Sequence, residues 1–349
     1  MTPSALSRAP RQSASVPSRR RPRSGSAALR LQAVAVAVAG TGVLVLAGCG
    51  GGNAQAGSGT DGEQAAAAAD AASVPAAPAR ITAGPEAEFD LVPAPGQSVG
   101  IAQPVSLHFK RKVKNKAAVE KALTVTASDN AEGSWGWVTT PAGQERLDWR
   151  PKEYWKPGTH VRVTGDLTTV DPGGAHFSHP LDSSFTIGAD QRLEADLDTH
   201  TLTVTHDGNP VQRFKMSGGE PVKDRASRPG TFVIKSKEDS VHMTSASVGG
   251  PKAYDTMVKS AMRFTDSGGY VHAAPWAEKA GDLGKRNKSA GCIGLSDANA
   301  AWVFKNTRLG DPLVIKGREA TGPDGGPGNG YGDWNLTWDQ WQTKSATHG

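Results

Sequence analysis

Three patterns of hydrophobic and polar positions follow one another along the chain. Residues 31–47 form an apolar run without a charged residue, directly after an arginine-rich segment. Residues 50–88 consist mainly of Gly, Ala, Ser and Pro and hold almost nothing that could be buried, which predicts a flexible linker. From Phe89 onward, short runs of alternating apolar and polar residues are separated by turn residues, a pattern that predicts β-strands.

About seven such runs fall between residues 89 and 188. Residues 105–109, 135–138 and 160–163 are clear examples. Seven short strands in about 100 residues are typical of an immunoglobulin-like β-sandwich. This segment contains no cysteine, so it is not the disulfide-bonded antibody variety.

A second series of strand patterns extends over residues 189–317. Residues 193–197 alternate, and Asp207-Gly208 predicts a tight hairpin in the next runs. Ser296 is a typical N-cap, so one or two short helices are expected in an otherwise β-rich domain. The predicted fold class is therefore mainly β.

Residues 318–349 form a glycine- and proline-rich extension that ends with three tryptophans. Trp338 and Trp341 are three positions apart and can share one face of a helix. Because disordered tails rarely carry several tryptophans, we expect this extension to dock on the domain before it.

The formal net charge of +5 is unevenly distributed. Residues 1–30 hold seven arginines and no acidic residue, and without them 32 basic residues face 34 acidic ones, a net charge of −2. The basicity therefore belongs to a targeting segment, and no nucleic acid partner is expected.

Residues 1–48 are typical of a secretory signal, with a basic region followed by an apolar one. The apolar run ends in Leu46-Ala47-Gly48-Cys49, and small residues before a cysteine resemble a bacterial lipobox. We expect Cys49 to carry a lipid that anchors the protein to the outer face of the cytoplasmic membrane. Residues 49–88 would then tether the globular part, and the export route stays open.

The second cysteine, Cys292, is a candidate nucleophile. Glycines at 291 and 294 permit a tight turn that exposes the sulfur and directs the amides of Gly291 and Cys292 at one site. Sixteen residues separate Ser289 from His272, which is predicted at a strand end and is a candidate base. On spacing alone, a buried structural cysteine is an equal alternative.

The segments 271–276 and 289–292 resemble the signature of YkuD-type L,D-transpeptidases of the bacterial cell wall. The resemblance covers nearly all of the chain beyond the linker and is greatest to actinobacterial, membrane-tethered members with an N-terminal immunoglobulin-like domain. It implies that residues 189–317 are the catalytic domain, on which the extension 318–349 would dock.

The resemblance also implies roles for individual residues. Cys292 would be the nucleophile and His272 the general base, with the main-chain carbonyl of Ala273 orienting the imidazole and the Gly291 amide binding the oxyanion. Neither a metal nor an organic cofactor is implied. For two of the implied substrate-binding residues, Tyr254 and Trp276, ordinary core packing is the alternative. The residues that would bind substrate are Tyr254, Ser267, Gly268, Met243, Trp276, Ser289 and Gly294.

Two positions depart from the family pattern. Ala290 stands where the family has histidine, and Gly294 where it has asparagine or arginine. The first change would loosen the nucleophile loop, and the second removes a polar group near the substrate carbonyl.

The function that the resemblance implies is a monomeric, exported enzyme that joins peptidoglycan stem peptides by 3→3 cross-links through a cysteine thioester. Carbapenems are a general inhibitor class of this family. Three alternatives stay open: water as acceptor would give an L,D-carboxypeptidase, a protein amine would give an anchoring enzyme, and decay at Ala290 and Gly294 would leave a wall-binding lipoprotein.

Overall fold

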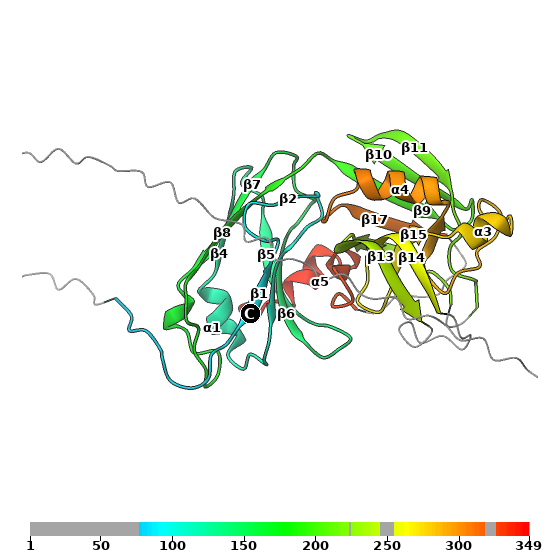
Figure 1. Ribbon diagram of the computed structural model, residues 1–349. Helices are drawn as coiled ribbons and strands as arrows, with labels where there is room; N and C mark the ends of the chain where they lie inside the picture. The colour runs from blue at the N-terminus through cyan, green and yellow to red at the C-terminus, as the bar shows by residue number, and fades with distance from the viewer. Residues whose placement is uncertain (1–76, 223–224, 245–254, 318–325, 349) are drawn as a thin grey trace, which may run out of the picture. The chain divides into compact units, whose positions relative to one another are not determined.

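The computed structural model describes residues 77–222, 225–244, 255–317 and 326–348, whose strands form four sheets (Figure 1). The predicted fold class, mainly β, is confirmed. Residues 1–48, predicted to be a secretory signal, lie outside the described residues, as do Cys49 and Tyr254.

The first domain is a sandwich of two four-stranded sheets. Apolar side chains from both sheets, including Leu107, Leu147 and Phe185, form one core between them. The flanking helices are α1 (Lys116–Lys121) and the short 3₁₀ helix η1 (Leu167–Thr169). One sheet has the strand order β1 (Phe89–Val92), β3 (Val105–Phe109), β6 (Glu145–Pro151), β5 (Gly133–Thr139). The other has the order β2 (Ser98–Val99), β8 (Leu181–Ile187), β7 (His160–Gly165), β4 (Thr124–Ala127).

The start of this domain lies earlier than the sequence predicts. Ile81 donates its N–H to the carbonyl of Thr168 at 2.8 Å, and Ala87 donates to that of His176 at 2.7 Å. Ala87 is also buried in the sandwich core. Residues 81–88, expected to belong to the linker, therefore pack against the sandwich.

The second domain also contains two sheets. The five-stranded sheet has the order β11 (Asn209–Lys215), β10 (Thr201–His206), β9 (Gln191–Asp196), β17 (Pro312–Lys316), β12 (Gly230–Val233). The four-stranded sheet has the order β13 (Ser236–Thr244), β14 (Asp255–Arg263), β15 (Tyr270–Ala273), β16 (Ile293–Leu295). Helix α3 (Pro275–Lys279) follows β15, and α4 (Asp297–Asn306) packs against β14, β15 and β16.

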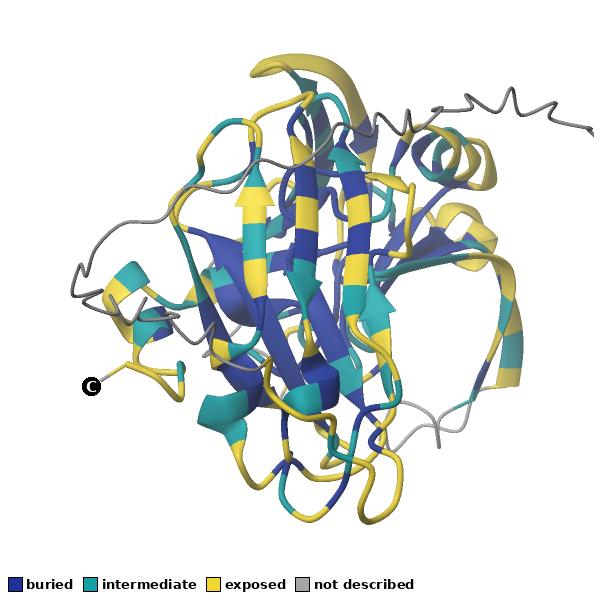
Figure 2. Ribbon diagram, turned by 90° about the vertical axis from the view of Figure 1, so that its left-hand side faces the viewer, coloured by how far each residue is buried: buried dark blue, intermediate teal, exposed yellow. Residues whose placement is uncertain are grey.

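Local sequence explains several of these elements. Asp207 and Gly208 both have positive φ, 47° and 76°, as a two-residue hairpin between β10 and β11 requires. The Ser296 hydroxyl accepts the N–H of Asn299 and so caps α4 as expected. Buried and exposed residues alternate along β7 and β8, and Figure 2 shows such alternation as bands of blue and yellow.

The C-terminal extension contacts both domains. Its 3₁₀ helix η2 (Gly332–Asn335) packs against β12, where the Asn335 side chain bonds both the N–H and the carbonyl of Thr231. Its helix α5 (Trp338–Gln342) instead packs against β5 of the sandwich, and the fully buried Trp341 donates its indole N–H to the carbonyl of Ser134 at 3.0 Å. The extension therefore packs against both domains, whereas the sequence predicts docking on the second domain alone.

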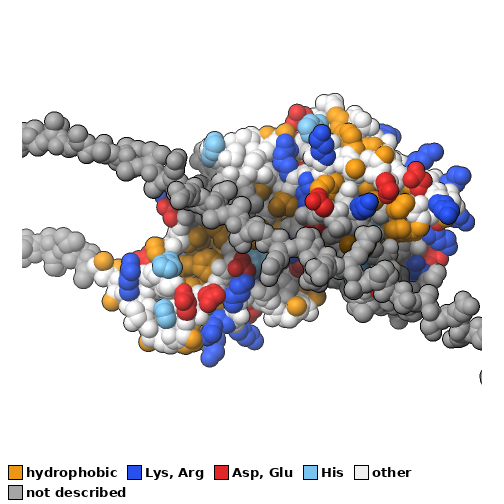
Figure 3. Space-filling view, viewed as in Figure 1, with side chains coloured by type: hydrophobic (Ala, Val, Ile, Leu, Met, Phe, Trp, Pro, Cys, Tyr) orange, Lys and Arg blue, Asp and Glu red, His pale blue; other side chains and the backbone are white. Residues whose placement is uncertain are grey.

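Within the described residues, no helix combines the length and the apolar character needed to cross a bilayer. On the face drawn in Figure 3, acidic and basic side chains of the described residues lie interspersed over the surface.

Candidate active site

One pocket of about 480 Å³ in the second domain contains most of the residues singled out from the sequence. The parallel pairing of β15 with β16 sets His272 opposite Gly294, and the chain enters β16 directly after Cys292. The predicted residues that line the pocket are Cys292, His272, Met243, Trp276, Ser289 and Gly294.

Cys292 is held in a tight, mostly buried turn. The preceding residue, Gly291, has φ of +112°, a conformation that favours glycine. The Cys292 side chain is 6% exposed, and burial raises the pKa of its thiol to about 11. Its Sγ lies 3.7 Å from the carbonyl oxygen of Gly268, close enough for a weak S–H···O contact. Burial therefore favours the neutral thiol over the thiolate at Cys292.

His272 lies in β15 and is almost fully buried. Its Nδ1 is 2.8 Å from the carbonyl oxygen of Ala273. A carbonyl only accepts hydrogen bonds, so Nδ1 carries the hydrogen and Nε2 has the lone pair of the neutral ring. Burial lowers the pKa of His272 below its ordinary value of 6.5. At neutral pH the ring is thus an uncharged base with a fixed tautomer.

Hydrogen bonds shape the loop that carries the cysteine. The Ser289 hydroxyl donates to the Cys292 carbonyl at 2.6 Å and accepts the Gly291 N–H at 3.2 Å. The Ser227 hydroxyl donates to the Gly291 carbonyl at 2.7 Å. The Gly291 amide, expected to be free for an oxyanion, is therefore engaged by Ser289 in this structure.

The two positions that depart from the family pattern both line the pocket. Gly294 exchanges two backbone hydrogen bonds with Ser217, at 2.8 and 2.9 Å. A Cβ at position 294 would lie only 2.9 Å from the Cβ of Ala274, so a larger residue there needs a shift of the neighbouring backbone. Ala290 is half-buried at the pocket wall.

Of two residues expected to bind substrate, Trp276 lines the pocket and Ser267 does not. Trp276 is 48% exposed, and its ring centre lies 5.9 Å from that of His272, so it walls the pocket rather than filling the core. Ser267 does not line the pocket. Its N–H and hydroxyl instead bond the side chain of Asn329, at 2.9 Å each.

The pocket also contains charged residues that sequence reasoning did not single out. Arg225, Lys288 and Asp282 line it, and Glu220 bridges the first two with ion pairs of 2.8 Å each. Lys288 is adjacent to the signature segment, whereas nothing in the sequence around Arg225 indicates its approach to the site.

The comparisons with known proteins agree with this fold. A family model for a bacterial Ig domain matches residues 60–171, and one for an L,D-transpeptidase catalytic domain matches residues 190–315. The chain belongs to the L,D-transpeptidase family.

Relatives from Mycobacterium tuberculosis are similar to this chain over more than half of its length. L,D-transpeptidase 2 (strain CDC 1551 / Oshkosh) is 33% identical over 264 residues, which cover 73% of this chain and 62% of that protein. L,D-transpeptidase 1 (strain H37Rv) is 34% identical over 229 residues, covering 64% of this chain and 83% of that protein. The chain thus spans less than two thirds of the length of L,D-transpeptidase 2.

Solved structures of L,D-transpeptidases are also similar to this chain. The structure of LD transpeptidase LdtMt1 in complex with imipenem has a TM-score of 0.56 and 32% identity, and covers 66% of this chain and 99% of that one. An L,D-transpeptidase from Mycobacterium smegmatis has a TM-score of 0.53 and 33% identity over the same shares.

Proposed function

We propose that the protein is a peptidoglycan L,D-transpeptidase that forms 3→3 cross-links through a thioester on Cys292. The observation that carries the proposal is the shared pocket of Cys292 and His272, in which the Ala273 carbonyl fixes the imidazole tautomer. A thiol and an uncharged base that line one pocket are the two groups that cysteine-based acyl transfer requires.

In the acylation step, the Cys292 sulfur attacks the carbonyl between the third residue of a tetrapeptide stem and its terminal D-alanine. Nε2 of His272 takes the thiol proton as the S–C bond forms, because neither group is charged beforehand. The same proton then passes to the departing amine, the C–N bond breaks, and D-alanine leaves a thioester on Cys292.

In the second step, the side-chain amine of the third residue of another stem attacks the thioester. His272 takes a proton from this amine, the C–S bond breaks, and the proton returns to the Cys292 sulfur. The product is an amide between the two third residues, and the resting thiol is restored.

Both steps develop a negative oxygen that needs hydrogen-bond donors. The Cys292 amide is one candidate. The Gly291 amide contributes only if the oxyanion replaces the Ser289 hydroxyl as its acceptor. A single donor of this kind is worth roughly 3–4 kcal/mol in comparable sites, so this exchange would matter for the rate.

A lipid on Cys49 and a monomeric state belong to the same proposal. The supporting observation for the anchor is the lipobox-like segment 46–49 that follows the apolar run. The tether would place the site in the cell wall outside the membrane.

The test is the mass of the protein after incubation with tetrapeptide stems or imipenem. We expect a covalent adduct that maps to Cys292 and no adduct on the Cys292→Ala variant. Mass analysis of the released products then separates a cross-linked dimer from a tripeptide, the carboxypeptidase outcome. No adduct on the reduced, folded protein would reject catalysis and favour the wall-binding alternative suggested by Ala290 and Gly294.

A further inference from the structure

The turn between β14 and β15, residues 264–269, provides the carbonyl that contacts the nucleophile. Gly268 has φ of +103°, and its carbonyl oxygen lies 3.7 Å from the Cys292 sulfur. The direction of this carbonyl therefore depends on how the turn is held.

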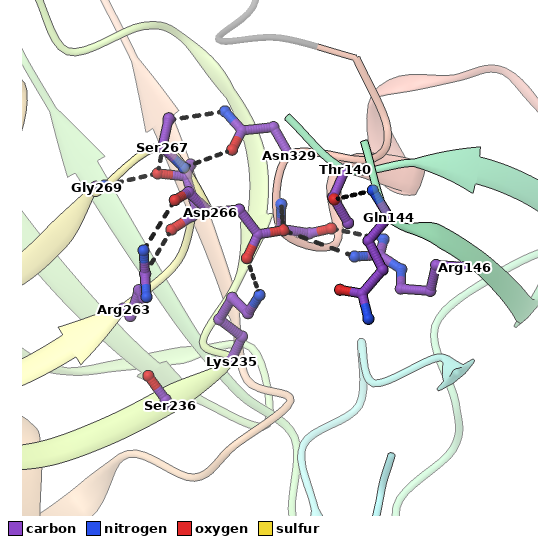
Figure 4. Close-up of polar contacts among 12 residues, drawn as sticks. Thr140, Gln144, Arg146, Lys235, Ser236, Arg263, Asp266, Ser267, Gly269 and Asn329 are labelled. Atoms are coloured by element: carbon purple, nitrogen blue, oxygen red, sulfur yellow. Dashed lines mark hydrogen bonds and ion pairs between the residues drawn. The ribbon is translucent and has the colours of Figure 1, made fainter. Parts of the chain in front are cut away.

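Contacts within the second domain hold one side of the turn (Figure 4). The Thr265 hydroxyl oxygen accepts the N–H of Gly269 at 2.6 Å and the hydroxyl of Ser267 at 3.2 Å. The guanidinium of Arg263 donates to the carbonyls of Thr265 and Asp266 at 2.9 and 2.8 Å. These bonds fix the turn to the end of β14.

The C-terminal extension holds the other side of the turn. Asn329, 4% exposed, accepts the N–H of Ser267 through Oδ1 and donates to its hydroxyl through Nδ2, both at 2.9 Å. The next residue, Gly330, donates its N–H to the Asp266 carboxylate at 3.1 Å. A Cβ on Gly330 would lie 2.3 Å from the Phe264 carbonyl oxygen, so the two segments approach as closely as only glycine allows.

The sandwich domain anchors this part of the extension in turn. The fully buried guanidinium of Arg146, from β6, donates to the Gly330 carbonyl at 2.6 Å and lies 3.9 Å from the Asp266 carboxylate. Lys235 also bonds that carboxylate. Asn329 and Gly330 thus link the first domain to the turn beside the nucleophile.

We propose that Asn329 is a positioning residue for Cys292: by holding the Ser267 amide, it sets the direction of the Gly268 carbonyl and so the orientation of the thiol. The inference rests on the proposed function, because it assigns Asn329 a part in the acylation of Cys292. A misplacement of about 1 Å at a reacting atom can cost 10²-fold in rate. The Asn329 side chain binds Ser267, the residue before Gly268, so it can affect the rate of acylation without contacting the substrate.

The extension offers a matched control in Asn335. Its side chain also makes two hydrogen bonds to one backbone residue of the second domain, Thr231, at 2.7 and 2.8 Å, but on β12, outside the residues that line the pocket. Asn329→Ala and Asn335→Ala therefore each remove two hydrogen bonds to one residue of the second domain, Asn335→Ala together with a 3.2 Å bond to the Gly332 carbonyl, and only the first removes them beside Cys292.

The experiment measures imipenem acylation and iodoacetamide alkylation of Cys292 against pH in the full chain, with Tm as the measure of folding. We expect Asn329→Ala to lower the acylation rate at least tenfold and Asn335→Ala to stay within twofold. Asn329→Asp, which keeps an oxygen for the Ser267 amide, is expected to stay within about threefold of the unchanged protein.

The alkylation midpoint is the readout that a purely structural role would not move. The Gly268 carbonyl accepts a hydrogen bond from the Cys292 thiol and so favours its protonated form. Displacing this carbonyl should therefore lower the pH midpoint of Cys292 alkylation in Asn329→Ala and leave it unchanged in Asn335→Ala. Among the described residues, none of the substitutions alters the ionisable side chains that line the pocket or face the thiol, which are His272, Arg225, Asp282, Lys288, Tyr270 and Cys292 itself.

Equal losses of acylation in the two alanine variants at equal Tm, or an unchanged rate in Asn329→Ala, would overturn the inference. If Asn329→Ala does not fold, Asn329→Ser replaces it, because the shorter side chain also cannot reach Ser267. If the unchanged protein is not acylated, the proposed function fails, and the alkylation midpoint alone then decides: a midpoint that is the same in both alanine variants would reject the positioning role.

Discussion

The substitution Gly294→Ala tests whether the pocket has space for a side chain larger than that of glycine at position 294. In Gly294→Ala, the new Cβ would lie 2.9 Å from the Cβ of Ala274, whereas carbon atoms pack at about 3.5–4.0 Å. Gly294 is buried, and its hydrogen bonds with Ser217 prevent β16 from moving freely. Overpacking of this kind costs about 1–3 kcal/mol, which corresponds to a fall of roughly 3–10 °C in Tm.

The assay is thermal unfolding combined with the rate of imipenem acylation. Because Gly294 is two residues from Cys292 and lines the pocket, we expect acylation to slow as well. A matched control is Gly326→Ala, where the new Cβ has no neighbour within 4 Å, and its stability should change by less than about 0.5 kcal/mol.

A second substitution shows whether the contact itself is responsible. Ala274→Gly removes the opposing Cβ, so it should cost less stability in the Gly294→Ala background than in the unchanged protein. We expect a coupling free energy of about 1 kcal/mol or more in favour of the double variant. Additive effects, or an unchanged Tm in Gly294→Ala, would refute the argument that position 294 lacks space for the family's larger residue.

Four further predictions concern the proposed base His272, the departure from the family pattern at Ala290, and the anchor. His272→Ala should lower acylation by roughly 10²–10⁴-fold, the usual effect of removing a positioned base. Since burial lowers the pKa of His272 below 6.5, the rate of the unchanged protein should be level above about pH 6.5 and fall only at lower pH. A rate that instead rises about tenfold per pH unit toward the thiol pKa of about 11 would mean that free thiolate attacks without the base. Ala290→His should raise carbapenem acylation about tenfold, as one recovered hydrogen bond would, whereas a slower reaction would show that the wall has repacked around alanine. Cys49→Ala should move the protein from the membrane to the soluble fraction with unchanged acylation, and retention in the membrane would assign anchoring to the apolar run.

Most strands were predictable because one face of each is buried and the other is not. Strands β9 and β10 follow this rule, with Leu193 and Leu202 in the core. β6 does not, because every one of its residues is buried. Its polar residues Arg146, Asp148 and Arg150 alternate as if exposed, yet the C-terminal extension covers them: Arg146 and Arg150 bond the carbonyls of Gly330 and Leu336.

Other features depend on contacts between distant segments and had no local signal. β13 and β14 were not predicted, because the polar residues of β13 are largely exposed in a hairpin ribbon and lack strict alternation. The pair of Cys292 and His272 was predicted from a family resemblance, not from spacing. The engagement of Ser267 by Asn329, 62 residues away, and the approach of Arg225 to the pocket follow only from the tertiary structure.

The covered face of β6 has a consequence for biosynthesis. The extension follows both domains in the sequence, so the sandwich can form while Arg146, Asp148 and Arg150 are still hydrated. Charged groups on that face keep a half-made chain from exposing an apolar sheet to other chains. They lose their water only when Tyr331 and Trp341 arrive to complete the buried layer. Because the last segment of the chain bonds both domains, the layer between them is complete only when the C-terminus has docked.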